Sequence, residues 1–256
     1  MKFESSNPFL KNKEFSGSRN SAHITTHEGI IIRDDEMTVS GTMNKSFLLL
    51  ALIVAAAAIT WSMAFNGDNV MPIAIGGAIA GLVAVLIAAF KPQYSAYLAP
   101  AYAIFEGLFL GAISAIFETQ YPGIVVNAVG ATFVTFVVCL SLYRFKIVKV
   151  TQQFRSIVIA ATLAIVTFYV IGGVLPMFTS FTPIHHGNSL MSIGISVFVI
   201  IVAALNLFLD FDMIEKGAEQ KQPKYMEWFG AIGLMVTLVW LYVEFLRLLS
   251  KLSSRD

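Results

Sequence analysis

Seven apolar stretches alternate with short polar segments along most of the chain. They cover residues 47–65, 71–90, 99–117, 124–143, 157–177, 193–211 and 228–249. Each is long enough to cross a hydrocarbon core of roughly 30 Å as an α-helix. None has the strict alternation of a membrane strand, and helices satisfy their own backbone hydrogen bonds in lipid. The pattern predicts an all-α integral membrane protein, a bundle of about seven transmembrane helices.

The remaining segments are polar and lie mostly at the two ends of the chain. Residues 1–46 contain no early apolar run, so we expect a polar cytoplasmic tail without a cleavable signal peptide. Residues 47–252 form the expected transmembrane domain, and residues 253–256 a short C-terminal tail. The first apolar stretch is then the insertion signal.

Composition supports the membrane assignment and argues against enzymes and nucleic-acid binding. Hydrophobic residues make up 57% of the 256 residues and charged residues 13%, which is too little charge to cover a soluble protein of this length. The chain contains no phosphate-binding glycine loop, HExxH motif or EF-hand spacing. We therefore expect no catalytic residues and no nucleic-acid partner, and we expect the lipid bilayer as the main surrounding.

Basic residues are distributed on one side of the predicted membrane topology. Residues 1–46 and the second, fourth and sixth connections hold 14 of the 17 Lys and Arg residues. Basic segments stay in the cytoplasm, so the N-terminus is expected inside, in a bacterial inner membrane. Arg247, Lys251 and Arg255 are the exceptions. A last segment that crosses fully would put them outside, whereas a re-entrant one would bring them back to the cytoplasm.

Pairs of small residues occur in the second and third stretches. Gly77 and Gly81, like Gly107 and Gly111, have the GxxxG spacing that lets helix backbones approach closely. Packing inside one bundle explains these pairs better than a dimer interface, because every helix of a bundle needs several neighbours.

Acidic residues inside apolar sequence are the candidate functional groups. Glu106 lies in the third stretch, Asp210 and Asp212 at the end of the sixth, and Glu244 in the seventh. An ionised carboxylate in hydrocarbon must be protonated, paired or hydrated, because its burial costs several kcal/mol. Each acid therefore marks a candidate ion pathway or a helix contact.

Helical geometry groups some of these acids with one amide. With the N-terminus inside, Glu106, Asn206 and Asp210 are expected at one depth, and the i, i+4 spacing puts the last two on one face. Asp212 is rotated by about 200° from Asp210, so a regular helix cannot direct both into one cavity. An ordinary helix end in the headgroup region is the alternative for the two aspartates.

Three motifs resemble the bacterial branch of the Bax inhibitor-1 family, also called the transmembrane Bax inhibitor motif family. They are FEGLFLGAIS at residues 105–114, LDFDMI at residues 209–214 and LYVEFLRLL at residues 241–249. The resemblance covers nearly all of residues 40–252. It implies a seven-helix bundle with a central last helix, and a pair of acids that gates a pH-sensitive calcium leak.

By motif position, the implied gate pairs Asp212 with Glu244. With both acids ionised, their oxygens suit a weak, transient calcium site, and calcium or protons are the implied ions, with no other cofactor. The family's gate includes an arginine that latches the sixth-helix acid, and none lies in the first three stretches. Arg247 is the nearest substitute, although a local ion pair with Glu244 explains it equally well.

Straight helices place the two gate acids far apart. Glu244 follows Trp228 by 16 residues, roughly 24 Å of helix, whereas Asp212 lies near the opposite end of its own stretch. The pair can form only if the sixth connection folds inward, the last helix starts late, or the last segment re-enters. Whether Asp210 or Asp212 is the partner stays open.

Two other functions use the same sequence differently. Some family members resemble regulators that bind a membrane protease or another membrane protein, and the polar tail and Lys-rich connections would then carry recognition. A proton-coupled transporter of a small solute would use the same acids but would need a substrate cavity.

Overall fold

The computed structural model describes residues 26–27, 30–31, 35–178 and 189–254. In this part of the chain seven α-helices follow each other: α2 (Val39–Phe65), α3 (Met71–Phe90), α4 (Ser95–Gln120), α5 (Ile124–Arg144), α6 (Gln152–Phe178), α7 (Leu190–Glu219) and α8 (Met226–Ser253). A 3-10 turn, η2 (Pro92–Tyr94), precedes α4, and two short antiparallel strands, β1 (Thr26–His27) and β2 (Ile30–Ile31), precede the helices. Residues 1–36 and 37–256 form two compact units.

All seven helices are long and apolar enough to cross a membrane. The predicted all-α fold of seven spans is therefore confirmed. Proline begins α3 at its first turn, where the missing amide proton costs little, and Thr38 caps α2 by accepting a hydrogen bond from the Gly41 amide at 2.9 Å. Local sequence thus fixes where the spans start.

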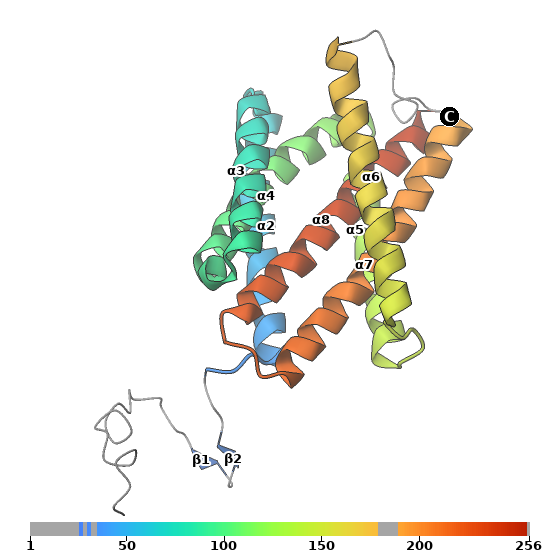
Figure 1. Ribbon diagram of the computed structural model, residues 1–256. Helices are drawn as coiled ribbons and strands as arrows, with labels where there is room; N and C mark the ends of the chain where they lie inside the picture. The colour runs from blue at the N-terminus through green and yellow to red at the C-terminus, as the bar shows by residue number, and fades with distance from the viewer. Residues whose placement is uncertain (1–25, 28–29, 32–34, 179–188, 255–256) are drawn as a thin grey trace, which may run out of the picture. The chain divides into compact units, whose positions relative to one another are not determined.

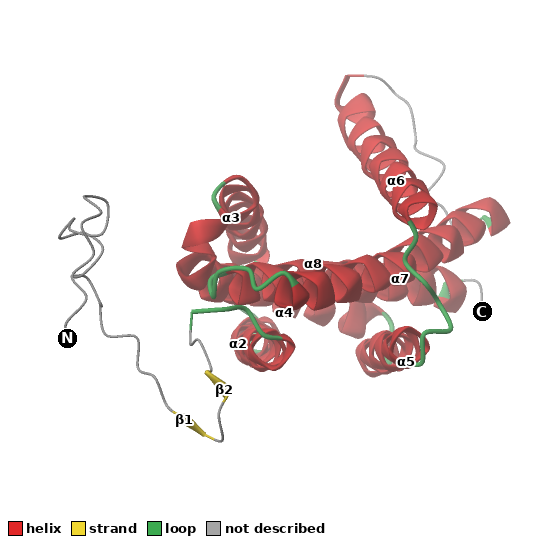
Figure 2. Ribbon diagram, turned by 60° about the horizontal axis from the view of Figure 1, so that its bottom comes forward, coloured by secondary structure: helices red, strands yellow, loops and turns green. Residues whose placement is uncertain are grey.

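The last helix, α8, lies in the middle of the bundle. It packs against α2, α4, α5 and α7, whereas α3 packs mainly on α4, and α6 mainly on α7 (Figures 1 and 2). The central position that the resemblance implied for the last helix is confirmed. Helix α8 is therefore the common neighbour of α2, α4, α5 and α7.

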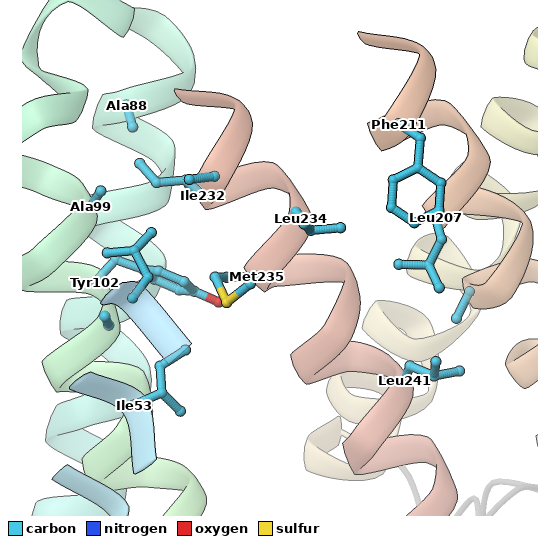
Figure 3. Packing of buried hydrophobic residues seen from close by; sticks show 14 of the residues in the cluster. Ile53, Ala88, Ala99, Tyr102, Leu207, Phe211, Ile232, Leu234, Met235 and Leu241 are labelled. Carbon is cyan, nitrogen blue, oxygen red and sulfur yellow. The ribbon is translucent and has the colours of Figure 1, made fainter. Parts of the chain in front are cut away.

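Apolar side chains of α8 connect the two sides of the bundle. Ile232 and Met235 lie toward Tyr102 on α4, and Leu241 lies toward Leu207 on α7 (Figure 3). These residues are almost completely buried. Because lipid chains are as apolar as leucine, this close packing of α8, and not the hydrophobic effect alone, holds the helices together.

Helices α7 and α8 differ from the sequence prediction in two respects. The sixth apolar stretch ends at residue 211, but α7 continues to Glu219, so Asp210 and Asp212 lie inside a helix and not at its end. The last segment, α8, is one continuous helix of 28 residues. A re-entrant last segment is therefore excluded in this structure.

Glycines of α4 allow α2 to pack at very short range. A Cβ atom at Gly107 would lie 2.5 Å from the carbonyl oxygen of Ile53, and one at Gly111 would lie 2.1 Å from that of Ala57. The GxxxG pair of α4 therefore serves packing inside the bundle, as predicted. Gly76 on α3, in contrast, has no atom within 4 Å of an added Cβ.

We predict that Gly111→Ala lowers the stability of the bundle, because the new methyl group meets a backbone carbonyl that cannot rotate away. Overpacking of this kind costs about 1–3 kcal/mol or more. The midpoint of thermal unfolding in detergent measures the effect. Gly76→Ala is the matched control and should leave the midpoint unchanged or raise it slightly, since alanine favours helix. Equal midpoints for the two variants would contradict the assigned α2–α4 contact.

Candidate functional site

Asp212 on α7 is held by two cations. Its Oδ2 atom lies 2.6 Å from Nη2 of Arg155 at the start of α6 and 2.8 Å from Nζ of Lys216, one turn further along α7. The Asp212 side chain is buried, whereas the two cations are partly exposed. The predicted substitute latch, Arg247, is not the partner of this acid. Arg155 takes that position because α6 packs beside α7 at this depth.

Glu244 on α8 has its own, separate set of partners. The hydroxyl of Tyr169 on α6 donates to its two carboxylate oxygens at 3.3 and 3.2 Å, and Arg247 approaches at 3.1 Å. The Arg247 guanidinium also lies 5.0 Å from the centre of the Tyr169 ring. The local i, i+3 ion pair, which was the alternative explanation of Arg247, is therefore present.

The structure does not bring Asp212 and Glu244 together. Their respective partners on α6, Arg155 and Tyr169, are 14 residues apart, which corresponds to roughly 21 Å along that helix. A single calcium ion cannot bridge carboxylates at this separation, because its oxygen ligands lie within about 2.6 Å. The expected pair is absent for the reason that straight-helix geometry indicated.

Between these two clusters, Asn206 forms a third polar contact with α6. Its side-chain amide donates to Oγ1 of Thr162 and to the carbonyl of Val202, both at 2.8 Å. Arg155, Thr162 and Tyr169 are seven residues apart, so they share one face of α6. We call these three residues and their partners Asp212, Asn206 and Glu244 the α6 polar row.

Asp210 lies beside the polar row in a cavity of about 450 Å³. The cavity is also lined by Asn206, Arg155, Lys216 and Met37, at the end of the bundle where α6 begins and α7 ends. Asp210 therefore shares a cavity with Asn206, and Asp212 is not among its lining residues, which fits the rotation of about 200° between the two aspartates.

The Asp210 carboxylate forms no ion pair with Arg155 or Lys216, the two cations that line its cavity and pair with Asp212. Its Oδ2 atom is buried and accepts no hydrogen bond from the described residues, and no ion pair of the described part of the chain includes it. Because a buried ionised carboxylate is costly, this site requires a proton, a water molecule or an added cation.

Glu106 is separated from this group. It lies between α4 and α3, where its Oε2 atom would be 2.9 Å from a Cβ at Gly81, and it does not line the cavity of Asp210. Of the three residues expected at one depth, the structure joins Asn206 and Asp210 in one cavity and leaves Glu106 outside it.

A further buried acid, Glu227, fixes the start of α8 to the start of α2. Its carboxylate is fully buried and accepts hydrogen bonds from the Thr38 amide and hydroxyl, both at 2.9 Å. It also pairs with Lys45 and, at 3.2 Å, with Lys224. The neighbouring Met37 amide donates to the Gln222 carbonyl at 2.7 Å. This cluster holds Met37 at the wall of the Asp210 cavity.

Sequence reasoning missed Glu227, Arg155 and Tyr169 as site residues. Glu227 stands next to Trp228 at a stretch boundary, where an acid is ordinary, and Arg155 was counted only as a cytoplasmic charge. The seven-residue spacing of Arg155, Thr162 and Tyr169 is visible in the sequence, because it puts polar groups on one face of a helix that begins before the apolar stretch.

No metal cage is formed in the described ranges. Among these residues no group of three His, Cys, Asp or Glu side chains could hold a metal ion. Asp212 and Glu244 instead belong to separate clusters on α6.

The fold and these clusters define a polytopic helical membrane protein with ionisable groups between its helices. The family model described as Bax inhibitor 1 like matches residues 7–254, and the chain therefore belongs to that family. No curated protein and no solved structure matches the chain. The match confirms the family that the three motifs resemble.

We predict that Arg155→Gln destabilises the bundle by about 1–2 kcal/mol, because it leaves the buried Asp212 with a single, partly exposed cation. Thermal unfolding in detergent measures the loss. Arg144→Gln, a change of an exposed arginine at the end of α5, is the control and should have no effect. If the two variants have the same midpoint of thermal unfolding, the Arg155–Asp212 pair contributes nothing to the packing of α6 on the bundle.

We predict that Glu227→Gln weakens the attachment of α2 to α8. The amide loses both ion pairs and presents donors toward Lys45 and Lys224, at a cost of about 2–4 kcal/mol for a fully buried group. Hydrogen exchange of the first turn of α2 should increase. The control is Glu219→Gln, an exposed acid at the end of α7. Unchanged protection at residues 38–42 would contradict this role.

Proposed function

We propose that this protein is a pH-sensitive leak pathway for calcium across the membrane, with no enzymatic activity. The observation that carries the proposal is the α6 polar row. It extends over roughly 21 Å of α6, a large part of a hydrocarbon core of roughly 30 Å. Polar side chains in lipid are costly, and a row of them on one face of α6 supports a hydrated path.

The row supports cation passage through the kind of groups that it contains. Carboxylates, hydroxyls and an amide supply the oxygen ligands that hard cations prefer. The loose packing of α6, which rests mainly on α7, makes this helix the element best able to move away from the bundle. Asp212 and Glu244 each hold a cation of the protein in the described state, so ion passage requires these pairs to open.

Asp210 supplies the pH dependence in this proposal. Asp210 lines a cavity at the mouth of the row, where the ionised form attracts a cation and the protonated form does not. A proton and a calcium ion therefore compete for the same carboxylate. With the basic end of the bundle in the cytoplasm of a bacterial inner membrane, this carboxylate responds to cytosolic pH.

We predict that the purified protein in calcium-loaded vesicles leaks calcium, and that the leak falls as the pH decreases because Asp210 becomes protonated. Asp210→Asn should reduce the leak at neutral pH at least fivefold and remove most of the pH dependence. A calcium-sensitive dye outside the vesicles measures the flux. Glu219→Gln controls for a general loss of negative charge and should leak like the unchanged protein.

Asp212→Asn tests the latch separately. Loss of its charge frees Arg155 and Lys216, so the leak should increase or change its pH response. Unchanged leak and unchanged pH response in both the Asp210 and the Asp212 variants would contradict the proposed pathway. Absence of any leak would instead favour the non-transporting alternative, a regulator that binds a membrane protease. Affinity capture from membranes, with and without residues 1–36, then identifies the partner.

A further inference from the structure

An apolar groove lies on the other side of the central helix from the polar row. It has a volume of about 380 Å³, and α2, α4, α5 and α8 form its walls. Trp61, Val129, Phe133 and Leu238 are among its lining residues. A pocket of this size is within the usual range for a small ligand.

The polar groups of the groove are almost all occupied. The hydroxyls of Ser114 and Tyr242 bond to each other at 2.7 Å, and the hydroxyl of Thr132 donates to the carbonyl of Ala128 at 2.8 Å. All other lining residues except Trp61 have apolar side chains. The walls therefore favour a hydrocarbon ligand, since a polar one would lose its hydrogen bonds to water without replacement.

The groove opens toward the lipid between α2 and α5. Helix α2 packs on α4 and α8, helix α5 packs on α8 and α7, and no extensive contact joins α2 to α5. At the rim, Val54 is 60% exposed and Phe133 is 47% exposed. These side chains belong to the bilayer-facing surface, so the groove continues an interface that already contacts hydrocarbon.

We propose that this groove binds one acyl chain of a bilayer phospholipid. From Leu50 to Trp61 it follows α2 for 11 residues, about 16 Å, which is close to half of a hydrocarbon core and therefore to one leaflet. The opening toward lipid between α2 and α5 gives an acyl chain of the bilayer direct access to the groove. A single chain is the occupant that fits.

The bound chain completes the packing of the bundle at this point. It fills the space between α2 and α5 that no side chain of the lining fills, and it covers the Ser114–Tyr242 pair between α4 and α8. The acyl chain therefore acts as a removable part of the core, distinct from the polar row on the α6 side.

The test uses Trp61 as a probe inside the groove. The full chain with Trp228→Phe and Trp240→Phe keeps only this tryptophan. It is reconstituted in phosphatidylcholine vesicles with or without bromine on the acyl chains, because bromine quenches tryptophan fluorescence on contact. Ala58→Phe, a change of a lining alanine on α2, fills the groove, whereas Ala55→Phe adds the same ring to an exposed position of α2 outside the lining.

We expect brominated chains to quench Trp61 at least twice as strongly in the starting protein and in the Ala55→Phe variant as in the Ala58→Phe variant. Circular dichroism shows whether each of the three proteins is folded. If the Ala58→Phe variant does not fold, quenching of the starting protein alone tests the proposal. Equal quenching in folded Ala58→Phe, or no quenching of the starting protein, would overturn the proposal. Chemical cross-linking into a dimer that Ala58→Phe abolishes would assign the groove to a second copy instead.

Discussion

The free-energy cost of charge in hydrocarbon is the constraint on which this structure depends. A bilayer offers no water to an ionised side chain, so each acid of the bundle needs a partner from another part of the chain. Asp212 meets Arg155 on α6, and Glu227 meets Lys45 on α2. Glu244 pairs with Arg247 of its own helix and is joined to α6 by the Tyr169 hydroxyl. The charges thus help to determine which helices are neighbours. Asp210 and Glu106 have no such ion pair among the described residues, and of the two only Asp210 lines the polar cavity.

The central helix combines packing with these polar contacts. Helix α8 carries Glu227 in its first turn and Glu244 nine residues before its end. Apolar residues between them, such as Ile232 and Leu241, pack on both sides of the helix (Figure 3). Lys251, at the end of the helix, is buried and donates to Oγ of Ser196 on α7 at 2.8 Å. The α6 polar row lies on one side of α8 and the apolar groove on another. One helix therefore separates a polar path from a lipid-facing pocket.

Much of the fold was predictable because its signals are local. Apolar length located every span, and GxxxG spacing located the tight contact of α4 with its neighbours. The partners of the acids could not be predicted from the sequence, since they depend on which helices meet. Arg155 illustrates the limit: by charge statistics it is a flanking residue, and only the packing of α6 on α7 makes it the partner of Asp212.

The basic residues near the end of the chain show a second limit of prediction from the sequence. Arg247 and Lys251 contradicted the charge asymmetry of the connections and suggested a re-entrant segment. In the structure, a continuous α8 carries both residues, and each has a partner within the bundle. A cation that is paired inside the protein no longer reports which side of the membrane it prefers. Charge counting fails where side chains are buried, as they are here.

The central claim is that water and ions reach the middle of the α6 polar row. Accessibility of a cysteine to a charged, membrane-impermeant thiol reagent tests it most directly, because Cys139 is the single native cysteine and can be replaced by alanine. Thr162→Cys lies in the row, and Leu163→Cys, the next residue, is exposed on the lipid side of α6. The account predicts rapid labelling at position 162 and almost none at position 163. Equal, slow labelling at both positions would contradict it.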